Sequence, residues 1–210
     1  MMKRDQCLQV LARYRTNEIV VAVYQAAQEW LHISPSDLNY TFTGAMGQGS
    51  SHALGIALGR PDKRVVVLDG DSSLLMNLGT LVTIAHAAPK NLVHCLCQNS
   101  TYETNGAVDI PGRGTVSFPG LAHEAGYPKT YTFESLDEWQ RAVDRILHED
   151  GPLFVDLHVE PGEHYPEALL LDSRVFCDQQ LNKRTKQCFA SLTDVVHKLE
   201  ETQVQREFLL

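Results

Sequence analysis

Short apolar runs alternate with longer amphipathic stretches along most of the chain. Valine-rich runs such as "RVVVLD" are typical of strands that are covered on both faces. Strands are predicted at residues 18–23, 64–69, 91–98, 129–133 and 153–159. Helices are predicted at residues 3–14, 24–32, 50–59, 73–88, 118–126 and 135–148. The alternation predicts an α/β fold, a doubly wound parallel sheet with helices on both faces.

The pattern changes after residue 160, where no further strand partner is recognisable. We expect residues 1–160 to form one domain and residues 161–210 to form a C-terminal helical extension. This extension packs either on the domain itself or on another subunit.

Composition and charge narrow the classes of function. The 210 residues are 43% hydrophobic and 21% charged, which is average for a globular domain. A net charge of −8 argues against binding to nucleic acid or to an anionic membrane surface. A polyanionic ligand would therefore need a local device such as a metal ion.

The expected compartment is the cytoplasm. No apolar run approaches the length of a membrane span, and the N-terminal residues lack the apolar core of a signal peptide. The cysteines are odd in number and scattered, which favours reduced thiols over a disulfide framework. They are Cys7, Cys95, Cys97, Cys177 and Cys188.

Two polar residues follow neighbouring predicted strands, namely Asp71 and Asn99. In an open parallel sheet, ligands bind beyond the carboxyl ends of the strands. Together with a loop carbonyl near Thr101, these oxygens suit Mg²⁺. A helix that begins at Ser72 or Ser73 would add an anion site at its N-terminus. Taken alone, the Asp-Ser pair is also an ordinary helix cap.

The arrangement resembles the thiamine diphosphate motif, written GDG and followed by NN after a helix and a strand. The resemblance makes Asp71, Asn99 and the backbone of Thr101 the Mg²⁺ ligands. It places Gly70, Ser72 and Ser73 among the residues that bind the cofactor. Two departures stand out: Ser72 replaces the usual glycine, and Gln98 replaces the first residue of the NN pair. Ser72 could weaken cofactor affinity or sharpen discrimination.

A second segment, "TGAMGQGSSHALGIALG", resembles the part of this family that holds the aminopyrimidine ring. The resemblance gives the carbonyl of Gly44 a hydrogen bond from the cofactor and makes Met46 the apolar wedge that bends it. Ala45 lies between them. Small residues allow the close approach of a backbone, and methionine is an adaptable apolar side chain. Without the metal motif, Met46 would be read as ordinary core.

The loop at 102–117 is long for a compact domain, so we interpret it as a lid over the cofactor. Candidate contacts to cofactor or substrate are Tyr102, Glu103 and Asn105, and Arg113 is a candidate for a substrate anion. His52 and Glu103 are possible catalytic residues. The alternative for each of them is an ordinary solvated or structural side chain.

The segments "LLMNLGTLVTIAHAAPKNLVH" and "STYETNGA" look most like the beta subunits of sulfopyruvate decarboxylases and the matching half of phosphonopyruvate decarboxylase. The resemblance implies a 2-oxo acid carboxy-lyase that requires thiamine diphosphate and Mg²⁺. In this family the catalytic glutamate comes from a pyrimidine-binding domain, for which 210 residues leave no room. We therefore expect a separate pyrimidine-binding alpha subunit and a heteromer with at least two copies of each chain.

Three other functions stay open at this stage. A carboligase of the acetolactate synthase type would share every motif. The beta subunit of a 2-oxoacid:ferredoxin oxidoreductase would need clustered cysteines for iron–sulfur ligation, which this chain lacks. The third alternative is a non-catalytic subunit that binds the cofactor.

Overall fold

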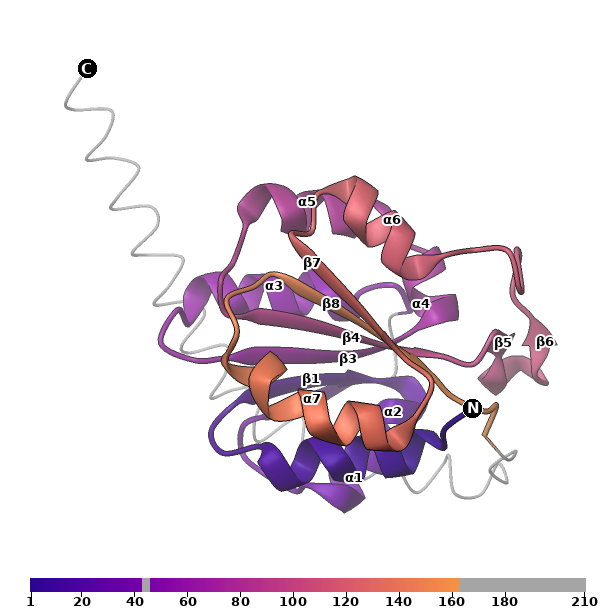
Figure 1. Ribbon diagram of the computed structural model, residues 1–210, viewed down its shortest axis with the longest axis horizontal. Helices are drawn as coiled ribbons and strands as arrows, with labels where there is room; N and C mark the ends of the chain where they lie inside the picture. The colour runs from indigo at the N-terminus through magenta and orange to yellow at the C-terminus, as the bar shows by residue number, and fades with distance from the viewer. Residues whose placement is uncertain (43–45, 163–210) are drawn as a thin grey trace. The chain divides into compact units, whose positions relative to one another are not determined.

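A sheet of six parallel strands forms the centre of the computed structural model, which describes residues 1–42 and 46–162 (Figure 1). The strands lie in the order β2-β1-β3-β4-β8-β7, and every neighbouring pair is parallel. Their bounds are Ile19–Val23 for β1, Asn39–Phe42 for β2, Val65–Gly70 for β3, Leu92–Gln98 for β4, Lys129–Phe133 for β7 and Leu153–His158 for β8.

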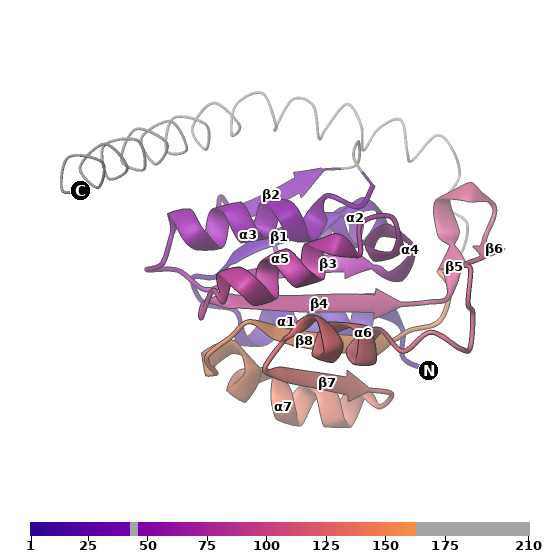
Figure 2. The ribbon, with the colours of Figure 1, turned by 90° about the horizontal axis from the view of Figure 1, so that it is seen from above.

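Helices cover both faces of the sheet, so the predicted doubly wound fold is confirmed (Figures 1 and 2). One face carries α1 (Arg4–Tyr14), α2 (Tyr24–Ile33) and α7 (Leu136–His148), and the other carries α3 (Gly49–Gly59), α5 (Gly79–Ala87) and α6 (Phe118–Ala125). Each face of the sheet has its own apolar core. Within β3, Val66 and Leu68 face the first core, under α1, α2 and α7, while Val65 and Val67 face the second core, under α3, α5 and α6. The strand is buried on both sides, which is why its sequence is a continuous apolar run.

The strand order places a crevice where ligands commonly bind. From β1 the chain goes to β2 on one side and then crosses back to β3 on the other side of β1. The reversal makes a topological switch point at the carboxyl ends of β1 and β3. The short hairpin of β5 (Thr101–Tyr102) and β6 (Val108–Asp109) lies beyond the carboxyl end of β4 (Figure 2).

The N-terminus also reaches this end of the sheet. Met2 pairs in parallel with Val159, just past β8, and its N–H donates to the carbonyl of His158 at 3.0 Å. The pairing positions the first turn of α1, with Arg4, beside the strand ends.

The predicted helix at 73–88 is interrupted. The structure has a short α4, Asp71–Leu75, and then α5. Between them, the N–H groups of Met76 and Asn77 donate to carbonyls three residues back, a tighter turn than the α-helix. Ser72 and Ser73 lie in the first turn of α4 rather than at its N-cap, which is Gly70.

Other sequence expectations were incomplete or fall outside the described residues. Strand β2, at the edge of the sheet, was not predicted. The long loop contains the β5–β6 hairpin and a 3₁₀ turn, Glu103–Asn105. The expected extension at 161–210 is described only for its first two residues and stays a prediction. Within the described residues, no helix combines the length and the apolarity that a membrane span requires.

Candidate functional site

The ends of β3 and β4 bring together two polar side chains that are far apart in sequence. Asp71 follows the last residue of β3, and Asn99 follows the last residue of β4. The two strands run in parallel, with Gly70 opposite Cys97, so both side chains emerge at the same rim. The Asp71 carboxylate bridges the two strand ends, because its Oδ2 accepts a hydrogen bond from the N–H of Ser100 at 2.5 Å.

The Asp71 carboxylate is buried, with 1% of the residue exposed. Its Oδ1 accepts a hydrogen bond from the N–H of Ser72 at 2.7 Å. Burial raises the pKa of Asp71 to about 6; the backbone N–H groups of Ser100 and Ser72 oppose this shift, and the negative charge of Glu103 adds to it. The charged form is therefore costly here, and a cation at this position would favour it.

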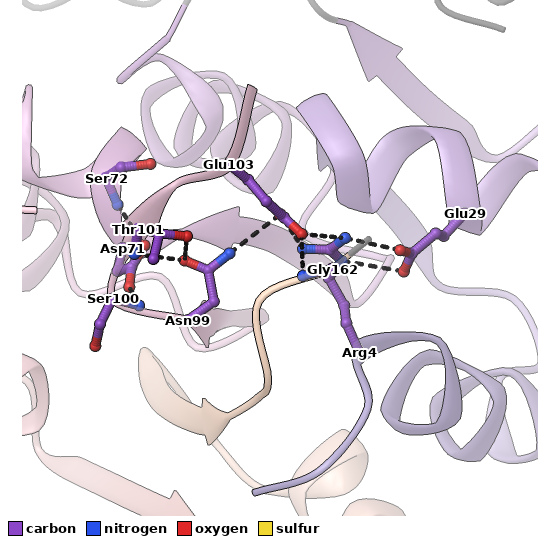
Figure 3. Close-up of polar contacts among 9 residues, drawn as sticks. All are labelled: Arg4, Glu29, Asp71, Ser72, Asn99, Ser100, Thr101, Glu103 and Gly162. Carbon is purple, nitrogen blue, oxygen red and sulfur yellow. Dashed lines mark hydrogen bonds and ion pairs between the residues drawn. The ribbon is translucent and has the colours of Figure 1, made fainter. Parts of the chain in front are cut away.

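The Asn99 amide is held at both ends (Figure 3). Its Oδ1 accepts from the N–H of Thr101 at 2.9 Å and from the hydroxyl of Thr101 at 3.2 Å. Its Nδ2 donates to Glu103 Oε2 at 3.1 Å. Ser100 has a φ of +62°, a left-handed conformation that is uncommon outside glycine and is often found at functional turns. The turn allows Thr101 to reach back to Asn99.

Glu103 belongs to a buried ion-pair network that the sequence did not predict. Arg4 donates from Nη1 to Glu103 Oε2 at 2.6 Å and binds Glu29 through two hydrogen bonds, at 3.0 and 2.8 Å. The N–H of Gly162 donates to Glu103 Oε1. Burial disfavours the charged form of Arg4, but hydrogen bonds to Glu29 and Glu103 outweigh it and raise the pKa of Arg4 above its ordinary value. The guanidinium is a permanent cation between two carboxylates.

These residues border a pocket that is partly open to solvent. The pocket lies at the switch point of the sheet and includes residues that follow β1, β3 and β4. The lining residues are Arg4, Val23, Tyr24, Gln25, Ala26, Met46, Asp69, Gly70, Asp71, Ser72, Ser73, Cys97, Asn99, Thr101, Glu103 and Thr104.

Two lining residues missed by the sequence analysis come directly after β1. Tyr24 has a φ of +49°, and Gln25 is 8% exposed with no hydrogen-bond partner for its Oε1 among the described residues. A buried amide with an unused polar atom is unusual and indicates a place for a polar ligand. Their position after a strand at the switch point was the signal that could have identified them.

The segment expected to hold the aminopyrimidine ring is described in part. Met46 lines the pocket, and the N–H of Gly47 donates to the hydroxyl of Ser73 at 3.0 Å. This bond ties the segment to α4. Gly44 and Ala45 lie outside the described residues, so their predicted contacts stay predictions.

His52 is not among the residues that line the pocket. Its ring packs edge-on against Phe42, with ring centroids 4.7 Å apart, and against Tyr40 at 5.7 Å. Partial burial lowers the pKa of His52. Its contacts are those of a side chain that joins α3 to β2.

Of the residues in the long loop that were predicted to contact cofactor or substrate, some line the pocket and others do not. Glu103 reaches the pocket, whereas the Tyr102 ring packs against the second core. Asn105 is exposed, and Arg113 forms an exposed ion pair with Asp109. None of Tyr102, Asn105 and Arg113 lines the pocket as described.

Asp71 and Asn99 fall within the part of the chain that a family model matches. The model for "Thiamine pyrophosphate enzyme, C-terminal TPP binding domain" matches residues 19–157. The chain belongs to this thiamine pyrophosphate enzyme family. Thiamine pyrophosphate is thiamine diphosphate, so the cofactor and the family anticipated from the sequence are confirmed.

Curated relatives agree with the assignment. Phosphonopyruvate decarboxylase from Streptomyces viridochromogenes is 35% identical over 148 residues. The match covers 70% of this chain and 37% of the relative. The beta subunit of sulfopyruvate decarboxylase from Methanothermobacter thermautotrophicus is 32% identical over 174 residues, 82% of this chain and 90% of the relative. The chain thus spans little more than a third of the phosphonopyruvate decarboxylases that it matches.

Solved structures show the same fold. Benzoylformate decarboxylase from Polynucleobacter necessarius has a TM-score of 0.64 and 24% identity, and the match covers 77% of this chain and 34% of that one. A 4-hydroxybenzoylformate decarboxylase from Rhodococcus jostii RHA1 has a TM-score of 0.65 and 20% identity over 77% of this chain and 33% of that one.

Proposed function

We propose that this chain is the diphosphate-binding subunit of a heteromeric, Mg²⁺-dependent 2-oxo acid decarboxylase. Its substrate is a short 2-oxo acid with an anionic tail, of the sulfopyruvate or phosphonopyruvate type. The observation that carries the proposal is that Asp71 and Asn99, from the ends of β3 and β4, both line the switch-point pocket. The relatives named as decarboxylases of these two acids support the substrate class.

The residues present fit the cofactor and its metal. Asp71 is a desolvated carboxylate, Asn99 Oδ1 is an amide oxygen, and the carbonyl of Thr101 is a third oxygen donor nearby. Such oxygen ligands suit Mg²⁺, which commonly bridges to phosphate groups. Gln25 Oε1, which has no hydrogen-bond partner among the described residues, offers a further polar atom in the same pocket. When bound, thiamine diphosphate would supply the electron sink that decarboxylation of a 2-oxo acid requires.

A second chain is proposed to supply the catalytic glutamate. Among the carboxylates of the described pocket, Glu103 has both oxygens engaged, by Arg4, Asn99 and Gly162. It is thus poorly placed to exchange a proton with a ligand. The relative that this chain matches over 90% of its length is named a beta subunit, which supports a separate alpha partner. At least two copies of each chain, and a location in the cytoplasm, belong to the same proposal.

Calorimetric titration of the full chain with thiamine diphosphate tests the site. Binding is expected to require Mg²⁺ and to be lost in Asp71→Ala, whose circular dichroism spectrum should match that of the wild type. Glu18→Gln is the matched control, because Glu18 is also a buried carboxylate, at 5% exposure, but it precedes β1 and does not line the pocket. Unchanged binding in Asp71→Ala would refute the metal assignment.

Release of CO₂ from sulfopyruvate and phosphonopyruvate tests the heteromer. We expect no release by the purified chain alone and release once the co-purified partner is added. Robust turnover by the chain alone would overturn the need for a partner. Formation of a coupled product from two 2-oxo acids would favour a carboligase, and tight cofactor binding without turnover would favour a non-catalytic subunit.

A further inference from the structure

We propose that Glu103 is a positioning residue, which fixes the side-chain amide of Asn99 so that its oxygen, and not its nitrogen, faces Asp71. This inference rests on the proposed function, because it assigns the Asn99 oxygen to the Mg²⁺ site. It also gives a role to the buried network in which Arg4 and Gly162 contact Glu103, and Glu29 contacts Arg4 (Figure 3).

The orientation of the Asn99 amide follows from the chemistry of its neighbours. An amide has two ends of nearly equal size, and only hydrogen bonds distinguish them. A main-chain N–H can only donate, so Thr101 N, at 2.9 Å, must face the oxygen of Asn99. An ionised carboxylate can only accept, so Glu103 Oε2, at 3.1 Å, must face the nitrogen. Both partners specify the same orientation.

Glu103 can perform this task because it is itself fixed. Its Oε2 accepts from Arg4 Nη1 at 2.6 Å, its Oε1 accepts from Arg4 Nη2 at 3.3 Å, and Oε1 also accepts from the N–H of Gly162. Arg4 is in turn held by Glu29 through two hydrogen bonds. Glu103 and Arg4 are 9% and 6% exposed, so water competes little for these bonds.

Loss of the Glu103 carboxylate would remove the acceptor that holds the nitrogen end of the Asn99 amide. The nitrogen of an amide carries two donor hydrogens and cannot act as a metal ligand, so every rotated conformer would lack one ligand. Partners that orient metal ligands typically account for about ten- to a hundredfold in metal affinity. A role for Glu103 that was only structural would change the stability of the fold and leave the affinity alone.

The test is a titration of the full chain with Mn²⁺ in the presence of thiamine diphosphate, followed by electron paramagnetic resonance. Glu103→Ala is expected to weaken Mn²⁺ binding by about ten- to a hundredfold. Glu18→Ala is the matched control, because Glu18 is also a buried carboxylate, but its side-chain bonds go to Thr16 and it contacts neither Arg4 nor Asn99. Its Mn²⁺ affinity is expected to stay within about threefold of the wild type, since no bond to a ligand is lost.

Glu103→Gln separates orientation from charge. The glutamine keeps an acceptor for Asn99 but has no negative charge, so we expect most of the affinity to return. Equal affinities in Glu103→Ala and the wild type, or equal losses in the Ala and Gln variants, would overturn the positioning role. If the wild-type chain binds no Mn²⁺ with the cofactor, the proposed metal site itself fails, which is a different result from an insensitive Glu103.

Discussion

The Arg4 guanidinium and the Glu103 carboxylate form a buried ion pair at 2.6 Å, although 99 positions separate the two residues in the chain. The pair joins the first turn of α1 to the turn that follows β5. Because Glu103 also accepts from Asn99, the start of the chain is connected to the rim of the pocket. The position of α1 is therefore part of how the site is built, and not only of how the sheet is covered.

Replacement of Arg4 by lysine should destabilise the fold. Arg4 donates to Glu29 and Glu103 through three nitrogen atoms, and a lysine ammonium cannot match this planar geometry. Arg4→Lys is expected to lower the free energy of unfolding by roughly 1.5–3 kcal/mol, the value of hydrogen bonds to charged groups. Urea denaturation measures this.

The exposed pair of Arg60 and Asp62 is the control for that prediction. Arg60 binds Asp62 through two hydrogen bonds of 2.8 Å, but the side chains are 44% and 59% exposed. Because water screens such pairs, Arg60→Lys should leave the free energy of unfolding almost unchanged. A similar loss in both variants would show that burial of Arg4 has no special effect.

The buried carboxylate of Asp156 should make stability depend on pH. Its Oδ2 lies 3.1 Å from His158 Nε2, and the side chain also faces the charges of Asp71 and Glu134. Burial raises the pKa of Asp156 from 3.8 to about 6, although His158 opposes the shift. The folded state thus binds a proton that the unfolded state has released between about pH 4 and 6, so this group makes the free energy of unfolding fall as pH rises through that window.

Comparison of the wild type with Asp156→Asn isolates this contribution. A shift of about two pKa units corresponds to at most about 3 kcal/mol. We expect the variant to gain up to that amount relative to the wild type between pH 4 and pH 7, as measured by urea denaturation. Parallel pH profiles for the two proteins would contradict the raised pKa.

The sequence predicted the features that depend on neighbouring residues. Valine-rich strands and the polar residues that follow them, Asp71 and Asn99, are local signals, and the parallel sheet brings them together as expected. The network behind them was not predictable in this way. Arg4 meets Glu29 and Glu103 across 25 and 99 positions, and nothing in a charged first helical turn specifies those partners.

Local sequence patterns gave wrong helix and strand bounds where tertiary contacts determine the backbone conformation. Residues 73–88 have a continuous helical pattern, yet the structure ends α4 at Leu75. There the Asn77 side chain donates to the carbonyl of Gly47 at 2.9 Å, a bond from outside the helix. The edge strand β2 contains only four residues, "NYTF", which is too short to give a clear alternating pattern.

A side chain at Gly47 should lower both the stability of the fold and the affinity for the cofactor. Its φ is +83°, and an added Cβ would lie 3.2 Å from the Cβ of Met76 and 3.3 Å from that of Asn77. Gly47→Ala is expected to lower the free energy of unfolding by about 1–3 kcal/mol through backbone strain and crowding. It should also weaken thiamine diphosphate binding, because the adjacent Met46 lines the pocket.

Gly106→Ala is the matched control for the crowding. Gly106 has almost the same φ, +82°, but an added Cβ would meet nothing within 4 Å. The two variants should therefore share the backbone strain, and only Gly47→Ala should change cofactor affinity. Equal cofactor affinities in the two variants would show that the contact between the Met46 segment and α4 is not needed for binding.

Ser72 occupies the position where the family motif has glycine, and this departure can be tested by reversing it. Ser72 lines the pocket beside Asp71, to which its N–H donates. Ser72→Gly removes the side chain from the edge of the proposed diphosphate site, so we expect cofactor affinity to rise by no more than about tenfold, the equivalent of one hydrogen bond. Because glycine is less favourable inside a helix, the free energy of unfolding should fall by about 0.5–1 kcal/mol.

Ser72→Ala separates the two parts of the side chain. It keeps the Cβ and removes the hydroxyl, so an affinity equal to that of Ser72→Gly would assign the effect to the hydroxyl. Affinity equal to that of the wild type would assign it to the Cβ. Calorimetry with thiamine diphosphate and Mg²⁺ measures all three proteins, and weaker binding by Ser72→Gly would show that the serine contributes to cofactor binding instead of limiting it.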